Sequence, residues 1–196
     1  MNQGELKDMV IAAAALSLAF FVLMSKNVLF SGKISIDSIL LYAGIAVVSV
    51  ATGFILHELA HRAIAKKFGC HAEFRLWNFG LLLAIFTAFL GFLFAAPGAV
   101  YIYGENISRK QNGLISIAGP ITNIVVGIIL FAISIVFFAN NQFFELIFRA
   151  AASLNFGLAF FNMIPFPPLD GSKVITWNPL IWGLVFFPLF AANFLI

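Results

Sequence analysis

The stretch from Ile39 to Ala65 reads ILLYAGIAVVSVATGFILHELAHRAIA, and it decides how the rest of the chain must be arranged. It is long and apolar enough to cross a membrane, since a spanning helix needs about 20 apolar residues. Its last third contains His57-Glu58-Leu59-Ala60-His61. Residues four apart on a helix differ by about 40° in direction and about 6 Å in height, so both imidazoles can reach one metal ion. The stretch therefore predicts a metal site within a membrane helix.

The glutamate between the two histidines indicates what that metal would do. On a helix, the pattern H-E-x-x-H supplies two zinc ligands and a general base that activates water for hydrolysis. A lone histidine in an apolar segment is usually a packed residue, but this pair with its glutamate is too costly in lipid to be kept for packing alone. We therefore predict that His57 and His61 bind one Zn²⁺ per chain and that Glu58 is the catalytic base.

The composition of the whole chain supports a membrane protein. Of its 196 residues, 62% are hydrophobic, 25 are phenylalanine and only 10% are charged, whereas about a quarter are charged in soluble domains. The net charge of +3 comes from lysines and arginines scattered between apolar runs. Such scatter is typical of topology determinants and not of a nucleic-acid-binding surface. The single cysteine, Cys70, excludes an internal disulfide.

Hydropathy predicts an all-α polytopic bundle of about five to six transmembrane helices, forming one integral membrane domain over residues 1–196. The first apolar stretch has no clear small-residue cleavage site, so we expect it to be retained as a helix. The predicted spans are residues 9–30, 39–65, 114–139, 143–164 and 174–196. A further apolar stretch, residues 79–103, is interrupted by Gly80, Gly91 and Pro97-Gly98.

A zinc site that keeps a position open for water needs a third protein ligand, and few donors follow the histidines. The candidates are Cys70, His71, Glu73, Glu105, Glu145 and Asp170. The first three lie in a polar segment where a solvated loop is expected, Glu105 lies in a polar connector, and Glu145 suits a helix N-terminus. Asp170 lies between a proline-broken apolar helix and Gly171, where an ionisable group indicates function. We favour Asp170 as the ligand; its alternative is to cap the helix after Gly171.

Together these motifs resemble those of the site-2 proteases, the family of zinc metalloproteases that cleave within the membrane. The similar segments are residues 57–61, Gly119-Pro120-Ile121-Thr122-Asn123, and Asn162 through Gly171. The stretch of chain from the second predicted span to Gly171 is more than half of the chain. The resemblance implies that His57, His61 and Asp170 bind zinc and that Glu58 is the base. It also implies that Asn162 helps to position the substrate.

The two halves of the predicted metal site constrain how often the chain crosses the membrane. His61 and Asp170 reach the same ion only if the number of complete crossings between them is even. Spans 114–139 and 143–164 make two, and residues 79–103 are too few for two helical spans. We therefore predict a re-entrant or membrane-inserted hairpin between the second and third spans, turning near Gly91 or Pro97-Gly98 and shielded by protein. We also expect this segment to offer an edge on which an unwound substrate pairs as a strand.

Charge predicts the orientation of the site. With a cytoplasmic N-terminus, eight of the 11 lysines and arginines fall on the cytoplasmic side and three on the other, as the positive-inside tendency prefers. The multi-pass protein would then carry its active site toward the cytoplasmic leaflet.

These observations predict a zinc-dependent intramembrane endopeptidase that hydrolyses peptide bonds in transmembrane segments, as in regulated intramembrane proteolysis. Its partners would be transmembrane or signal-peptide-like protein substrates and the lipid bilayer, with no nucleic acid. Two alternatives stay open. One is another membrane-embedded zinc hydrolase, such as a prenyl-protein protease, although those typically recruit a downstream glutamate. The other is a catalytically silent protein with structural zinc, against which Glu58 argues because a structural site needs no base.

Overall fold

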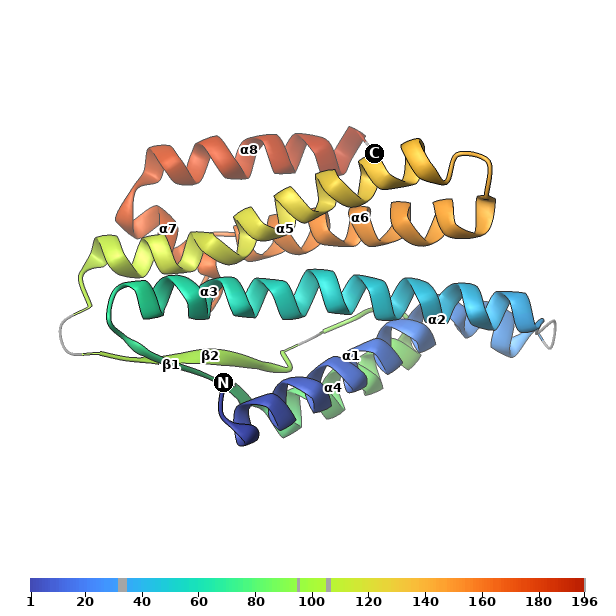
Figure 1. Cartoon of the computed structure of the whole chain (residues 1–196), viewed down its shortest axis with the longest axis horizontal. Coiled ribbons are helices and arrows are strands. Elements are labelled where there is room, and N and C mark those ends of the chain that lie inside the picture. The colour runs from blue at the N-terminus through green and yellow to red at the C-terminus, as the bar shows by residue number, and fades with distance from the viewer. Residues whose placement is uncertain (32–34, 95, 105–106, 196) are drawn as a thin grey trace.

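The computed structural model describes residues 1–31, 35–94, 96–104 and 107–195, and most of them are helical (Figure 1). Four helical stretches are long and apolar enough to cross a membrane: Gln3–Val28, Ile36–Lys67, Arg109–Phe137 and Gln142–Asn162. In chain order, the elements are α1 (Gln3–Phe30), α2 (Ile36–Val50), the π-helical turn η1 (Ala51–Ile55), α3 (Leu56–Lys67), β1 (His71–Leu76), α4 (Asn78–Leu90), β2 (Gly98–Tyr103), α5 (Arg109–Phe137), α6 (Gln142–Asn162), α7 (Asp170–Trp177) and α8 (Pro179–Leu195).

The long helices begin at polar residues that the sequence places just before the apolar runs. Asn2, Ser35, Ser108 and Asn141 each accept a hydrogen bond from a backbone N–H three residues further on, which satisfies one of the unpaired donors of the first turn. At Ser108 the Gln111 side chain also accepts from the Ser108 backbone N–H, completing a capping box. These caps explain why several helices begin earlier than their apolar cores.

Two predicted features of the architecture are wrong. Residues 174–196 are not one span, because α7 ends at Trp177 and α8 begins at Pro179. Between them, Asn178 is extended, with φ −151° and ψ 101°, since a proline disfavours the helical conformation in the residue before it. The predicted helical class is confirmed, since most described residues are helical, but one local expectation is wrong. The segment after α3, expected to be a solvated loop, forms β1, which pairs antiparallel with β2 from His71↔Tyr103 to Leu76↔Gly98.

The predicted re-entrant stretch consists of α4 and β2. The two paired strands β1 and β2 form a ribbon. The backbone N–H of Trp77 donates to the Pro97 carbonyl over 3.0 Å, so the chain leaves β1 and returns to β2 at the same end of this ribbon. Helix α4 ends at Gly91, whose φ of 99° lies in the left-handed region that glycine adopts without strain. The Thr87 hydroxyl then accepts from the backbone N–H of Phe94 over 3.0 Å, which turns the chain back. One of the two predicted turn positions, Gly91, is therefore where the helix ends.

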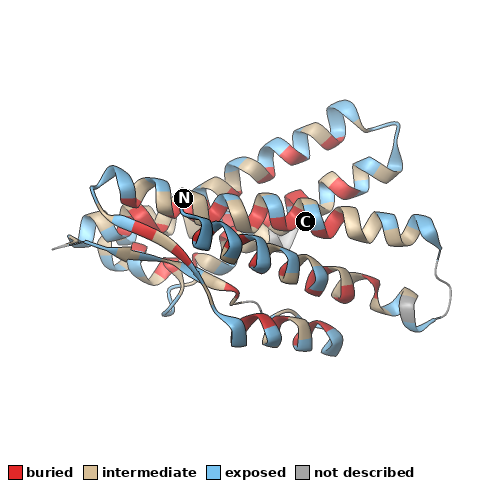
Figure 2. Cartoon of the chain, turned by 60° about the horizontal axis from the view of Figure 1, so that its bottom comes forward, coloured by how far each residue is buried: buried red, intermediate tan, exposed pale blue. Residues whose placement is uncertain are grey.

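The elements form layers with the long helix α2-η1-α3 in the middle (Figure 1). On one side of it lie α1 and α4; on the other lie α5, α6 and α8. Buried residues concentrate where these layers meet, whereas outward faces are exposed (Figure 2). One core cluster joins α1, α2 and α4 through Phe20, Val50 and Ala84, and another joins α6, α7 and α8 through Met163, Val174 and Leu189. Helix α3 therefore lies between the ribbon and the α5–α7 layer.

Candidate metal centre

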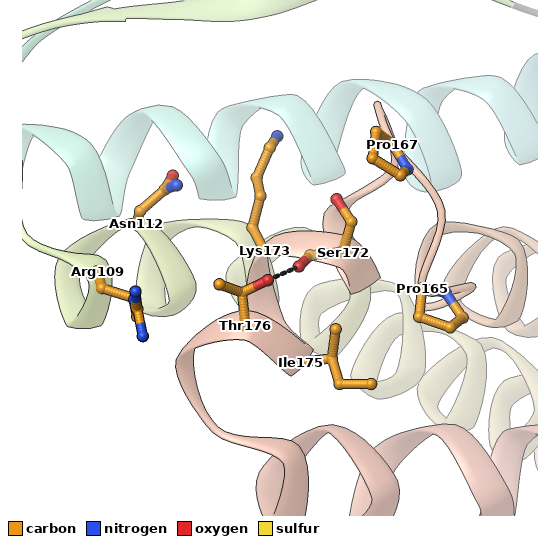
Figure 3. A pocket seen from close by; sticks show the side chains of 8 residues that line it. All are labelled: Arg109, Asn112, Pro165, Pro167, Ser172, Lys173, Ile175 and Thr176. Carbon is orange, nitrogen blue, oxygen red and sulfur yellow. Dashed lines mark hydrogen bonds between the residues drawn. The ribbon is translucent and has the colours of Figure 1, made fainter.

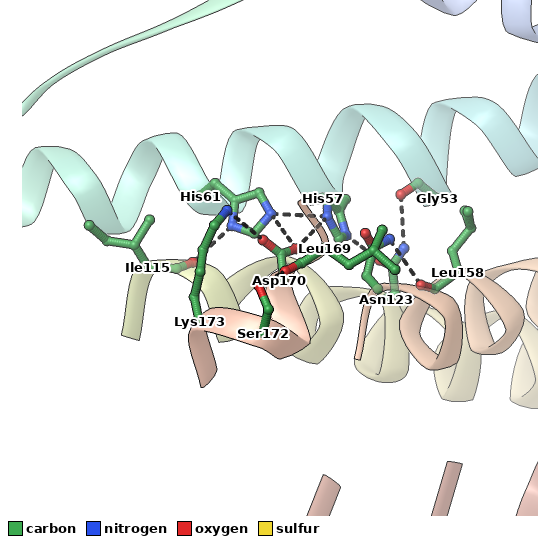
Figure 4. A network of polar contacts seen from close by, with 11 residues as sticks. Gly53, His57, His61, Ile115, Asn123, Leu158, Leu169, Asp170, Ser172 and Lys173 are labelled. Carbon is green, nitrogen blue, oxygen red and sulfur yellow. Dashed lines mark hydrogen bonds and ion pairs between the residues drawn. The ribbon is translucent and has the colours of Figure 1, made fainter. Parts of the chain in front are cut away.

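Three potential ligands from two distant parts of the chain converge between α3 and α7 (Figure 4). His57 and His61 lie one turn apart on α3 with their Nε2 atoms 3.0 Å from each other. Asp170 Oδ2 lies 3.4 Å from His57 Nε2 and 3.1 Å from His61 Nε2. All three residues are buried. The elements thus bring the three predicted ligand positions together.

The separations of these atoms fit a zinc ion. Bonds of about 2.0–2.2 Å at tetrahedral angles place neighbouring ligand atoms about 3.3–3.6 Å apart, close to the values found here. Two imidazole nitrogens and one carboxylate oxygen are a donor set of catalytic zinc sites, which keep the fourth position open. Gly119 on α5 leaves the space beside them free, because a Cβ there would lie 2.6 Å from the Nε2 atom of both His57 and His61.

Hydrogen bonds fix which nitrogen of each imidazole faces the other ligands. His61 Nδ1–H donates to the Ile115 carbonyl over 2.8 Å, and His57 Nδ1–H donates to Asn123 Oδ1 over 2.6 Å. Because a carbonyl or amide oxygen only accepts, both Nδ1 atoms carry protons, and in the neutral imidazole this leaves the lone pair on Nε2. This second layer of partners orients a metal-binding histidine and raises its basicity.

The partner of His57 belongs to a longer buried network. Asn123 Nδ2 donates to the Gly53 carbonyl over 2.8 Å and to Asn155 Oδ1 over 3.0 Å. Asn155 Nδ2 in turn donates to Thr52 Oγ1 over 3.0 Å. Both asparagines are fully buried, and Thr52 and Gly53 lie in the π-helical turn directly before the histidines, a kind of turn frequent at functional sites. The network therefore ties His57 to α5, α6 and η1.

Sequence reasoning did not find this network. Asn123 entered only as the last residue of a motif, and Asn155 was not considered. A signal was present, because an asparagine in an apolar span must find a hydrogen-bond partner within the protein. What the sequence could not supply is the partner, since Asn155 lies 103 residues from Thr52.

Asp170 reaches the histidines because of how the chain enters α7. The N-cap of α7 is Leu169, and Asp170 is the first helical residue with no side-chain cap bond at that end. Its carboxylate points to the two imidazoles, and its second oxygen, Oδ1, lies 3.6 Å from Lys173 Nζ. A Cβ on Gly171 would lie 2.2 Å from the Met163 carbonyl, so only glycine allows the close approach of this loop. The capping alternative for Asp170 is therefore not what the structure shows.

The remaining candidates lie elsewhere. His71 and Glu73 belong to β1, with His71 Nε2 3.7 Å from Glu73 Oε2, and Cys70 is half-buried beside them. Glu145 pairs with Arg149 one turn along α6, at 2.9 Å. Glu105 falls outside the described residues. Asn162 is the last residue of α6, and its amide donates to the Leu158 carbonyl of its own helix over 3.0 Å.

Glu58 lies on α3 between the two histidines and faces the ribbon. Its carboxylate interacts with the backbone N–H of Val100 on β2. The base predicted from the sequence is thus next to both the metal ligands and a β-strand.

This fold and this donor set define a class of protein, a membrane-embedded zinc metallopeptidase. The model of Peptidase family M50 matches residues 45–145, just over half of the chain. The chain is 39% identical over 190 residues to "Putative zinc metalloprotease MJ0611" of Methanocaldococcus jannaschii, covering 96% of this chain and 92% of that protein. It therefore belongs to peptidase family M50, the site-2 protease family.

Other relatives agree with this assignment. The chain is 30% identical over 152 residues to "Putative zinc metalloprotease YwhC" of Bacillus subtilis, covering 66% of each protein. It is 32% identical over 121 residues to "Zinc metalloprotease MJ0392" of M. jannaschii, covering 62% of this chain and 30% of that longer protein. No solved structure matches the chain. The family and the four apolar helices make the chain an integral membrane metallopeptidase that uses zinc.

Proposed function

We propose that the protein is an intramembrane endopeptidase that hydrolyses peptide bonds in transmembrane or signal-peptide-like segments of membrane proteins. In this proposal His57, His61 and Asp170 hold one zinc ion and Glu58 is the catalytic base. One observation carries it: three potential donor atoms converge, two of them on a helix that belongs to the candidate span Ile36–Lys67 and the third at the start of α7. A peptide bond must therefore reach the site at membrane depth.

Several residues of this chain have separate roles in the proposed reaction. Zinc in this site would acidify a water molecule to a pKa of about 7 and polarise the scissile carbonyl. Glu58, one residue after His57, takes the proton of the attacking water and later delivers it to the leaving amine. Asn123 and the Ile115 carbonyl hold the imidazoles in the tautomer that binds metal. The apolar helices around the site keep other water away.

The ribbon offers a place for an unwound substrate. The backbone N–H groups of Phe74 and Leu76 point away from β2, because they donate to Glu5 and Asp8 on α1. Residues opposite them in an antiparallel pair also direct their backbone groups outward, and these are Val100 and Gly98. A substrate strand added to this edge of β2, in place of the contact between Glu58 and the Val100 N–H, would gain main-chain hydrogen bonds and pass beside Glu58.

We further propose that α4 enters the membrane and returns without crossing it, and that the site faces the cytoplasmic leaflet. The return of the chain at Trp77 and Pro97 supports this topology. In a Cys70→Ser background, single cysteines at positions 67, 108 and 141 can be labelled with an impermeant maleimide. We expect 67 and 108 to react from the cytoplasmic side and 141 from the other; reaction of 67 and 108 from opposite sides would refute the model.

Asn162 is proposed to position the substrate, since it lies at the end of α6, directly before the loop that leads to Asp170. Its amide nitrogen donates to the Leu158 carbonyl of its own helix, a bond that does not use its amide oxygen. Asn162→Ala should raise KM for a model substrate while the zinc content stays at one per chain. An unchanged KM would remove this role.

The decisive experiment compares wild type with Glu58→Gln in reconstituted bilayers, measuring bound zinc and cleavage of a model transmembrane substrate. We expect both proteins to bind one zinc ion, and only wild type to cleave. Full cleavage by Glu58→Gln would overturn the proposed mechanism. Zinc binding by wild type without cleavage of any tested transmembrane substrate would instead favour the catalytically silent alternative.

A further inference from the structure

A cavity of about 410 Å³ lies next to the metal centre, between the first turn of α5, helix α7 and the loop before α7, and Pro165, Pro167 and Ile175 form its apolar walls (Figure 3). Two cationic side chains line it, Arg109 and Lys173, together with the neutral polar side chains of Asn112, Ser172 and Thr176. Within the part of the chain that the structure describes, no carboxylate lines this cavity. Its charge is therefore positive, and it suits a small anion that accepts hydrogen bonds.

The cavity connects directly to the metal centre through one side chain. Lys173 Nζ lies 3.6 Å from Asp170 Oδ1, while Oδ2 of the same carboxylate faces the two histidines. Lys173 keeps 42% of its side chain exposed, and in Figure 4 it rises beside His61. A ligand that contacts Lys173 in the cavity would thus share a neighbour with the carboxylate that faces the two histidines.

The closeness of the cavity to the metal centre indicates which molecule would supply the anion. An extended peptide advances about 3.3 Å per residue, so a side chain within about three residues of a bond held at the metal can enter the cavity. Arg109 begins a candidate span, which places the cavity at a membrane interface, where charged residues of a substrate are found. A lipid phosphate would match the charge as well, but it would not account for the connection to Asp170.

We propose that this cavity is a specificity subsite that binds an acidic side chain of the substrate, one to three residues from the scissile bond. The inference rests on the proposed peptidase function. Arg109 supplies the charge-assisted hydrogen bond that distinguishes a carboxylate from its amide or from lysine, and Lys173 provides a second positive charge at the inner end. Without an anionic partner in the cavity, the Arg109 guanidinium would make hydrogen bonds only to water.

The test uses matched transmembrane substrates that carry Asp, Asn or Lys in turn at each of the three positions on either side of the cleaved bond. Wild type should cleave the best-placed Asp substrate about tenfold more efficiently than its Lys counterpart, since a hydrogen bond to a charged group is worth about 1.5–3 kcal/mol. Arg109→Glu should abolish or reverse this preference. Lys110→Glu is the matched control, because Lys110 is the exposed neighbour outside the cavity, and it should keep the preference.

Binding of the same substrates to the Glu58→Gln protein separates the two hypotheses. Tighter binding of Asp substrates, lost in a Glu58→Gln/Arg109→Glu double variant, supports the subsite even if no cleavage is found. Equal binding and equal cleavage of Asp and Lys substrates would overturn the subsite and leave the peptidase proposal intact. An Arg109→Glu effect equal for all substrates, present only in bilayers with anionic lipid, would overturn it in favour of a lipid site.

Discussion

The metal centre and the ribbon formed by β1 and β2 are held in place by different kinds of contact. Around the proposed metal ligands, neutral hydrogen bonds between buried or partly buried groups join α3, α5, α6 and η1. The ribbon is held from one side by acidic residues of α1. Glu5 accepts from the Phe74 N–H and pairs with Arg62, with Nε 2.6 Å from Oε1, while Asp8 accepts from the Leu76 N–H. Its other edge lies beside Glu58, and no third strand pairs with it in the part of the chain that the structure describes.

This difference matches what each region must do. A ligand for zinc must be held in one orientation, and a buried network achieves this because breaking any bond leaves an unsatisfied polar group at a cost of about 1–3 kcal/mol. An edge that receives a substrate strand must not already be paired with a neighbouring strand. The carboxylates of α1 satisfy the opposite edge, so that only β2 is available.

The largest effect is expected at the metal ligand from α7. Asp170→Ala removes the carboxylate from the proposed ligand set and should abolish both zinc binding and cleavage, because two histidines alone do not complete a catalytic zinc site. Metal analysis of the purified protein measures the first and a cleavage assay the second. Asp37→Ala, at an exposed carboxylate of the first turn of α2, should change neither. Retention of zinc by Asp170→Ala would show that another residue is the third ligand.

A smaller effect is expected from the network behind His57. Asn123→Ala removes the acceptor of His57 Nδ1–H and leaves Asn155 with an unpaired oxygen, so zinc affinity should fall by about 10–100-fold. Chelator competition measures this. Asn162→Ala, which lacks a contact with the ligands, should leave zinc affinity unchanged. If the two variants bound zinc equally well, the network would be structural only.

In the ribbon, Glu5→Gln keeps an acceptor for the Phe74 N–H but removes the charge opposite Arg62. Because Glu5 is only 2% exposed, we expect unfolding free energy to fall by about 1–3 kcal/mol, less than for a fully buried pair. Cleavage should fall through KM while zinc content is unchanged, since the substrate edge shifts and the metal site does not. Loss of zinc in this variant would mean that the two regions are not separable.

The smallest effect is expected at an ion pair that belongs to neither region. Glu145 and Arg149 lie one turn apart on α6, and the Arg149 side chain is 48% exposed. Glu145→Gln should therefore change unfolding free energy by less than about 1 kcal/mol. Denaturant titration in detergent compares it with Glu5→Gln. A cost equal to that of Glu5→Gln would show that burial does not distinguish the two pairs.

The placement of the two histidines on one helix and four of the apolar spans could be predicted from sequence because they depend on local periodicity. The strand β1 was missed, although Ala72, Phe74 and Leu76 alternate with His71, Glu73 and Arg75 in the two-residue period of a strand. The polarity of the segment concealed it. The break at Pro179 was also visible in the sequence, but the apolar run around it suggested one continuous span.

The sequence by itself determined that two imidazoles and a carboxylate share one helical turn, because helix geometry fixes residues four apart on the same face. Tertiary structure alone decided that Asp170 completes the cluster, that Asn155 acts through Asn123, and that the outer edge of β2 lies beside Glu58. Each of these depends on contacts between residues tens of positions apart, and local periodicity contains no information about which distant elements pack together.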